Sequence, residues 1–111
     1  MHFTGEQRFD GDAAMLAEVV GVFRGSRPAM VRALSDAVAR KDAAAIERAA
    51  HSIKGAVGNF AAAAAAKAAG RIEEMGREKK LAGAAKACSA LEKELARLDE
   101  ALAILVKAQA A

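Results

Sequence analysis

The chain has 111 residues, the size of one domain, and carries a formal charge of +3 with acidic and basic residues interspersed. This length allows one modest core and leaves no room for the nucleotide-binding domain of an ATP-consuming enzyme. No aromatic residues lie among the basic ones, and no segment approaches the roughly 20 apolar residues that cross a bilayer. These features argue against nucleic acid and membrane as partners.

The composition predicts an all-α protein. Strong helix formers dominate, there is a single proline, and no segment alternates as a strand does. The single cysteine, Cys88, excludes an internal disulfide, and the early residues lack the apolar core of a signal peptide. The expected compartment is therefore the cytoplasm.

An irregular lead-in is expected over residues 1–11, ahead of a folded domain over residues 12–111. A first helix is predicted over about 12–24, where apolar residues recur at helical spacing. Pro28 then interrupts the pattern and either starts a new helix in its first turn or kinks a continuing one. The apolar stripe resumes and reaches Arg40.

Three further helices are predicted. The first begins at about Asp42, whose carboxylate can cap it, and continues to Phe60; the second spans about 62–79. The last segment has the clearest pattern, an apolar seam that steps by three and four: Leu81, Ala84, Cys88, Leu91, Leu95, Leu98, Leu102 and Leu105. Such a seam is typical of a helix packed at a shallow angle on its neighbours. We expect an antiparallel four-helix bundle with an additional N-terminal helix capping one end.

The leucine seam would also suit an intermolecular coiled coil. Packing within the bundle is favoured, because the other helices also need an apolar partner, and we expect a monomer. Cys88 lies on this seam and is expected to be a buried packing residue. A metal site is not expected, because the sequence offers Cys88 no second cysteine and no cluster of histidines.

The stretch AAHSIKGAVGNF, residues 49–60, departs from the rest of the chain because it places glycines inside a helix, where they are unfavourable. On a helical wheel one face is apolar and must point to the bundle interior: Ile46, Ala50, Ile53, Val57 and Phe60. The opposite face carries His51, Lys54, Gly55 and Gly58. The histidine is therefore expected to be exposed.

This exposed face suits phosphoryl transfer. Gly55 and Gly58 remove side chains next to the imidazole of His51 and leave a flat landing area. A neutral imidazole has a free lone pair that can act as a nucleophile. Lys54 would stabilise the negative charge of a phosphoryl group accepted there. One function then explains both the histidine and the costly glycines.

At these residues the sequence resembles the histidine-containing phosphotransfer (HPt) domains of multistep two-component phosphorelays. The family's pattern is His, any residue, Leu or Ile, Lys-Gly, a small residue, any residue and Gly, and residues 51–58 read HSIKGAVG. The resemblance covers about residues 12–105. It departs from the family at Ala61, where glycine is common, and at Ala65, where a bulky aliphatic residue is common.

The resemblance implies roles for individual residues. His51 is the phosphoryl acceptor, Lys54 stabilises the phosphoryl group, and Gly55 and Gly58 admit the active site of a partner. Further basic residues are candidates for partner docking: Arg48, Lys67 and Arg71. The partners implied are response-regulator receiver domains, which supply Mg²⁺, and a sensor histidine kinase of ordinary or hybrid type. The chain itself is expected to hold no cofactor.

Other interpretations are weaker. In the phosphoacceptor helix of sensor kinases an acidic residue follows the histidine directly and a proline comes soon after, whereas Ser52 follows His51 and no proline lies downstream. A structural or dimerising bundle would leave His51 incidental. Glu73 and Glu74 are expected to be surface charges rather than an acid/base pair. We therefore expect a stoichiometric phosphoryl carrier and not an enzyme.

Overall fold

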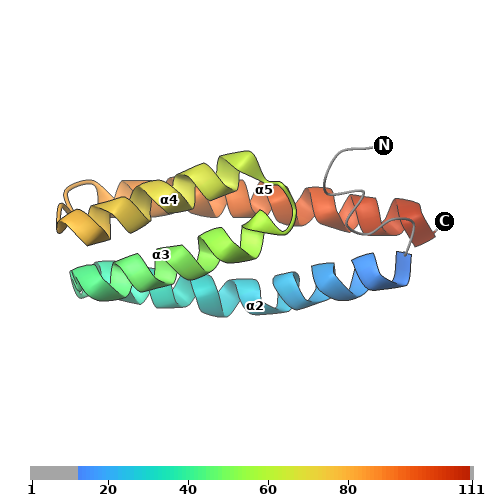
Figure 1. Ribbon diagram of the computed structural model, residues 1–111, viewed down its shortest axis with the longest axis horizontal. Coiled ribbons are helices and arrows are strands. Elements are labelled where there is room, and N and C mark those ends of the chain that lie inside the picture. The colour runs from blue at the N-terminus through green and yellow to red at the C-terminus, as the bar shows by residue number, and fades with distance from the viewer. Residues whose placement is uncertain (1–12, 111) are drawn as a thin grey trace.

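Residues 13–110, the part of the chain that the computed structural model describes, form four antiparallel α-helices (Figure 1). The helices are α2 (Ala13–Ala39), α3 (Ala43–Gly58), α4 (Ala63–Glu78) and α5 (Ala84–Ala110). Each packs against two others, so that α2, α3, α4 and α5 follow one another around the bundle, and α3 and α4 form the most extensive pair. Within residues 13–110 there is no strand, which confirms the all-α prediction. The lead-in predicted for residues 1–11 lies outside the described residues.

The additional N-terminal helix expected across one end is not confirmed in residues 13–110. Residues 13–39 form one helix, and Pro28 lies inside it. A proline in a helix interior loses a backbone hydrogen bond and costs about 3 kcal/mol. Burial of one large apolar side chain contributes about 1.5–3 kcal/mol, and an apolar stripe that continues on both sides of the proline is buried: Leu16, Val20, Phe23, Leu34 and Ala37. This burial offsets the local cost and keeps the helix continuous.

The helix ends follow from local chemistry. Lys41 and Lys79 adopt left-handed φ angles of 56° and 58°. The backbone N–H of the next residue donates in each case to the carbonyl five positions earlier, which is the Schellman arrangement that closes a helix. Asp42 then caps α3, because its Oδ1 accepts a hydrogen bond from the N–H of Ala45 at 3.1 Å. The predicted N-cap is confirmed.

The α5 seam forms much of the core, as predicted, up to its C-terminal end. Cys88, Leu91, Leu95 and Leu102 are buried, and burial raises the pKa of the Cys88 thiol. The prediction that Leu105 belongs to the seam is wrong, because 41% of it is exposed and Val106 packs against the core instead. Leu105 follows Ala84 by 21 residues along the seam, and over each heptad the 3.6-residue period drifts about 20° from the seven-residue pattern.

The two long helices extend beyond the α3/α4 pair at one end of the bundle (Figure 1). There α2 and α5 have fewer helices to pack against, and large apolar side chains remain accessible: Met15, Ile104 and Leu105. Among the residues described, no helix combines the length and the apolar character that a membrane span requires.

Gly76 lets α4 approach α3 closely. A Cβ atom at this position would lie 2.7 Å from the carbonyl oxygen of Ala43 and 2.7 Å from the backbone nitrogen of Glu47. Both are backbone atoms of α3, so neither can swing aside. The contact sets the spacing of the two helices that carry the charged residues described below.

We predict that Gly76→Ala lowers the free energy of unfolding by about 1–3 kcal/mol, because the clash with α3 outweighs the gain in helix propensity. Gly70→Ala is the matched control, since its Cβ would meet only the side chain of Lys54 at an ordinary 3.7 Å. It should be neutral or stabilise by up to about 1 kcal/mol. Urea unfolding measures both, and equal stabilisation by the two variants would contradict the close approach.

Candidate functional site

The two faces of α3 differ sharply in exposure. Ile46, Ala50, Ile53 and Val57 are completely buried. His51 lies on the other face, with 69% of its side chain exposed. The helical period alone therefore brings the imidazole to solvent, while the neighbouring turns anchor α3 in the core.

Gly55 and Gly58 lie on the exposed face with His51. A Cβ atom at either position would meet no heavy atom within 4 Å apart from the helix's own nearby backbone. The fold therefore does not need glycine at either position, in contrast to Gly76. Gly55, in the interior of α3, weakens the helix by about 1 kcal/mol relative to alanine, whereas Gly58 is its last residue and costs less. What the two glycines provide is open surface beside the histidine.

Glu73 of α4 is the buried centre of the site. Only 7% of its side chain is exposed, and its Oε2 lies 2.8 Å from Nδ1 of His51. Its Oε1 lies 2.6 Å from Nζ of Lys54. One carboxylate thus joins the histidine and the lysine of α3, each through a different oxygen.

The ionisation of Glu73 fixes the role of each ring nitrogen. The hydrogen bond from Lys54 lowers the pKa of Glu73 most, and the hydrogen bond with His51 lowers it further, against the opposing effect of burial. An ionised carboxylate only accepts hydrogen bonds, so Nδ1 of His51 must donate. In the neutral ring the proton then sits on Nδ1, and the lone pair is on Nε2.

Arg77 and Glu47 complete the cluster. Nη2 of Arg77 lies 3.3 Å from Oε2 of Glu73, and its Nε donates to Oε2 of Glu47 at 3.2 Å. We call these five residues the α3/α4 charge cluster: Glu47, His51, Lys54, Glu73 and Arg77. It contains two carboxylates, two fixed cations and one titratable ring.

The prediction of Glu73 as a surface charge is wrong, whereas Glu74 is exposed as expected. Glu73 follows Ala69 by four residues and precedes Gly76 by three, which places it at the edge of the buried face of α4. This spacing is the feature of the sequence that could have indicated the burial of Glu73. It is weak, because Glu is rarely buried unless it is paired, and the pairing residues come from another helix.

The basic residues suggested for docking form no ion pair with the cluster. Arg48, Lys67 and Arg71 are exposed, and none of them forms an ion pair within the described part of the chain. Residues 13–109 also contain no group of three or more His, Cys, Asp or Glu side chains that could hold a metal ion.

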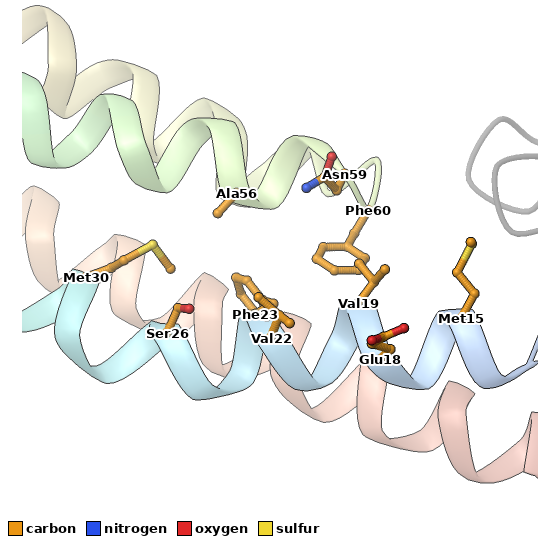
Figure 2. Close-up of a pocket in the computed structure, with 10 residues that line it drawn as sticks. All are labelled: Met15, Glu18, Val19, Val22, Phe23, Ser26, Met30, Ala56, Asn59 and Phe60. Carbon is orange, nitrogen blue, oxygen red and sulfur yellow. The ribbon is translucent and has the colours of Figure 1, made fainter.

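A groove of about 490 Å³ lies on another side of α3, between α3 and α2 (Figure 2). Its lining is mainly apolar: Met15, Glu18, Val19, Val22, Phe23, Ser26, Met30, Ala56, Asn59 and Phe60. The rings of Phe23 and Phe60 meet edge to face at a centroid distance of 5.4 Å. Phe60 is half-buried here rather than fully inside the core. The charge cluster and the groove therefore occupy different sides of the same helix.

A family model of the Hpt domain matches residues 18–101, most of the chain. The chain belongs to the Hpt domain family. The resemblance seen in the sequence is thereby confirmed, and with it a place in phosphorelay signal transduction. Members of the family are phosphotransfer carriers rather than kinases, and they work with response-regulator receiver domains and kinases. No curated protein and no solved structure matches the chain.

The lowered pKa of Glu73 predicts how stability depends on pH. A carboxyl group whose pKa is lower in the folded state than its ordinary value of 4.5 stabilises the fold above that value. This contribution is lost as the pH falls through the folded-state pKa. The difference in unfolding free energy between the parent protein and Glu73→Gln should therefore shrink on acidification from pH 7 to pH 3.

Urea unfolding across that pH range measures the effect. Glu74→Gln is the matched control, because Glu74 is the exposed neighbour on the same helix. Its unfolding free energy should follow that of the parent protein at every pH. A constant difference between Glu73→Gln and the parent would contradict an ionised, partnered Glu73.

Proposed function

We propose that this Hpt domain accepts a phosphoryl group on Nε2 of His51 from the aspartyl phosphate of a receiver domain and passes it to the aspartate of another. The observation that carries the proposal is the pairing of an exposed imidazole with a buried, ionised carboxylate through Nδ1. This arrangement leaves Nε2 as the nucleophile. The chain would act as a monomeric, stoichiometric carrier in the cytoplasm and not as an enzyme.

The proposed transfer makes one bond and breaks one, and the cluster stabilises the charge that develops on the ring. The lone pair of Nε2 attacks phosphorus, an N–P bond forms, and the bond from phosphorus to the aspartyl oxygen breaks, returning the receiver's carboxylate. The ring becomes positively charged while Nδ1 keeps its proton. Glu73 stabilises that charge through the hydrogen bond from Nδ1, as a buried carboxylate stabilises an imidazolium in hydrolase triads. Transfer to the next receiver is the reverse of these steps.

Lys54 is proposed to stabilise the phosphoryl group. It stands one turn after His51, and its Nζ already lies beside the carboxylate that His51 contacts. Its side chain is 42% exposed, so the ammonium can turn toward an anion on the ring. We propose that the receiver supplies the Mg²⁺ and that a sensor histidine kinase, hybrid or separate, is a further partner.

Gly55, Gly58 and Arg48 are proposed to form the docking surface. The glycines leave the surface beside His51 flat, so the active site of a receiver can come within bonding distance of Nε2. Arg48 is exposed on the same helix and would favour an acidic partner.

We predict that His51→Gln abolishes phosphoryl acceptance and leaves the helical content unchanged, because the side chain is exposed. The measurement is the transfer of radioactive label from a panel of phosphorylated receiver domains. His2→Gln is the control, since it removes the only other histidine of the sequence. Acid-labile labelling retained by His51→Gln would rule out His51 as the acceptor.

We predict that Gly55→Leu raises the receiver concentration needed for half-maximal transfer by about tenfold or more, because its side chain would stand where the partner must approach. The fold should tolerate the change, since the position is open. Ala96→Leu, at an exposed position of α5, is the control for added apolar bulk. Unchanged transfer by Gly55→Leu would contradict the proposal that Gly55 keeps the surface beside His51 open for a receiver.

A further inference from the structure

In the proposed function Lys54 contacts two anions in turn, Glu73 at rest and the phosphoryl group after transfer. In the structure its Nζ lies 2.6 Å from Oε1 of Glu73, the closest pairing within the α3/α4 charge cluster. Stabilising a phosphoryl group on His51 would draw the ammonium away. Oε1 of Glu73 would then lose its cation while the carboxylate remained buried.

The positively charged ring contacts only Oε2, so Oε1 of the buried carboxylate would be left without a cation, which is unfavourable. A carboxylate that takes up a proton or rotates toward water is a weaker acceptor for Nδ1 of His51. The ring needs that acceptor most at this moment, because the new N–P bond makes it positively charged. Another group must therefore hold Glu73 while Lys54 is engaged.

Arg77 stands in the right place. Its Nη2 lies 3.3 Å from Oε2 of Glu73, the same oxygen that accepts from His51. Its Nε is held by Glu47 of α3 at 3.2 Å, so the guanidinium spans two carboxylates from two helices. A planar guanidinium with several donors suits such a bridge. Arg77 has no contact with His51 itself among the described residues.

We propose that Arg77 is a positioning residue, which holds Glu73 against Nδ1 of His51 while Lys54 is engaged with the phosphoryl group. The inference rests on the proposed phosphotransfer by His51. Arg77 touches none of the reacting atoms and acts through Glu73 alone. Glu47 fixes the guanidinium from the opposite side.

The effect of losing Arg77 should depend on whether Lys54 is present. At rest Lys54 donates to Glu73 at 2.6 Å, whereas the contact of Arg77 is a longer ion pair. Loss of Arg77 should therefore change the tautomer ratio of His51 little while Lys54 is present. It should change that ratio strongly when Lys54 is absent. The substitution Lys54→Ala reproduces this situation without any phosphoryl group.

The test is the tautomer of His51, read from ¹⁵N–¹H NMR spectra at neutral pH. In the Lys54→Ala background, Arg77→Gln should shift the ratio of Nδ1–H to Nε2–H tautomer about tenfold toward Nε2–H, because the hydrogen bond from Nδ1 to the charged carboxylate is then weakened. In the parent background the same substitution should shift it far less. Arg77→Lys should restore most of the Nδ1–H form, because it keeps a cation near Glu73.

Arg71→Gln is the matched control, since Arg71 is an exposed arginine of the same helix without an ion pair in the described residues. The inference is overturned if Arg77→Gln shifts the tautomer ratio no more than Arg71→Gln in the Lys54→Ala background. A second measurement covers the case in which the double variant unfolds: single-turnover transfer by Arg77→Gln alone. Its maximal rate should fall about tenfold with an unchanged half-saturating receiver concentration, and an unchanged maximal rate overturns the inference.

The two proposals fail in different ways. The tautomer measurement needs no phosphoryl donor, so it tests Arg77 even if no receiver ever labels His51. If His51 is labelled but the Arg77 variants show no change in its tautomer ratio, the proposed function stands and Arg77 has no part in it.

Discussion

The site depends on one buried carboxylate. Glu73 is inserted between α3 and α4 with 7% of its side chain exposed, and it is tolerable there only because cations and a ring N–H surround it. These partners come mainly from α3, so the carboxylate fixes the register between the two helices as well as the orientation of His51. The close approach of the helices at Gly76 makes the distances short enough for direct contact.

Glycines serve opposite purposes on the two helices. Gly76 is required by packing, since a Cβ there would strike the α3 backbone, whereas Gly55 and Gly58 face open space. Gly55 and Gly76 lie inside their helices, where glycine costs about 1 kcal/mol relative to alanine, whereas Gly58 ends α3 and costs less. Only at Gly76 does tighter packing offset that cost within the fold. At Gly55 and Gly58 the compensation has to lie outside the chain, which is consistent with a surface kept clear for a partner.

Features that depend on one helix were predictable from the sequence, and features that depend on two were not. The exposure of His51, the interior stripe around Ile53 and the cap at Asp42 follow from local period and local hydrogen bonding. The burial of Glu73 depends on which residues of α3 face it, and no spacing along the chain encodes that register. The sequence left open for a related reason whether the helix continues through Pro28, because the local cost of the proline is visible in the sequence while the burial that outweighs it belongs to the bundle.

The charge balance of the cluster bears on the reversibility of the proposed transfer. At rest two carboxylates face Lys54 and Arg77, so a neutral His51 leaves the cluster without net charge. A phosphoryl group would add about 1.5–2 negative charges, and the positively charged ring would offset only one of them. The loaded cluster would therefore be left with excess negative charge that its own cations do not cancel. A receiver that brings Mg²⁺ would relieve the imbalance, which favours passing the group on over storing it.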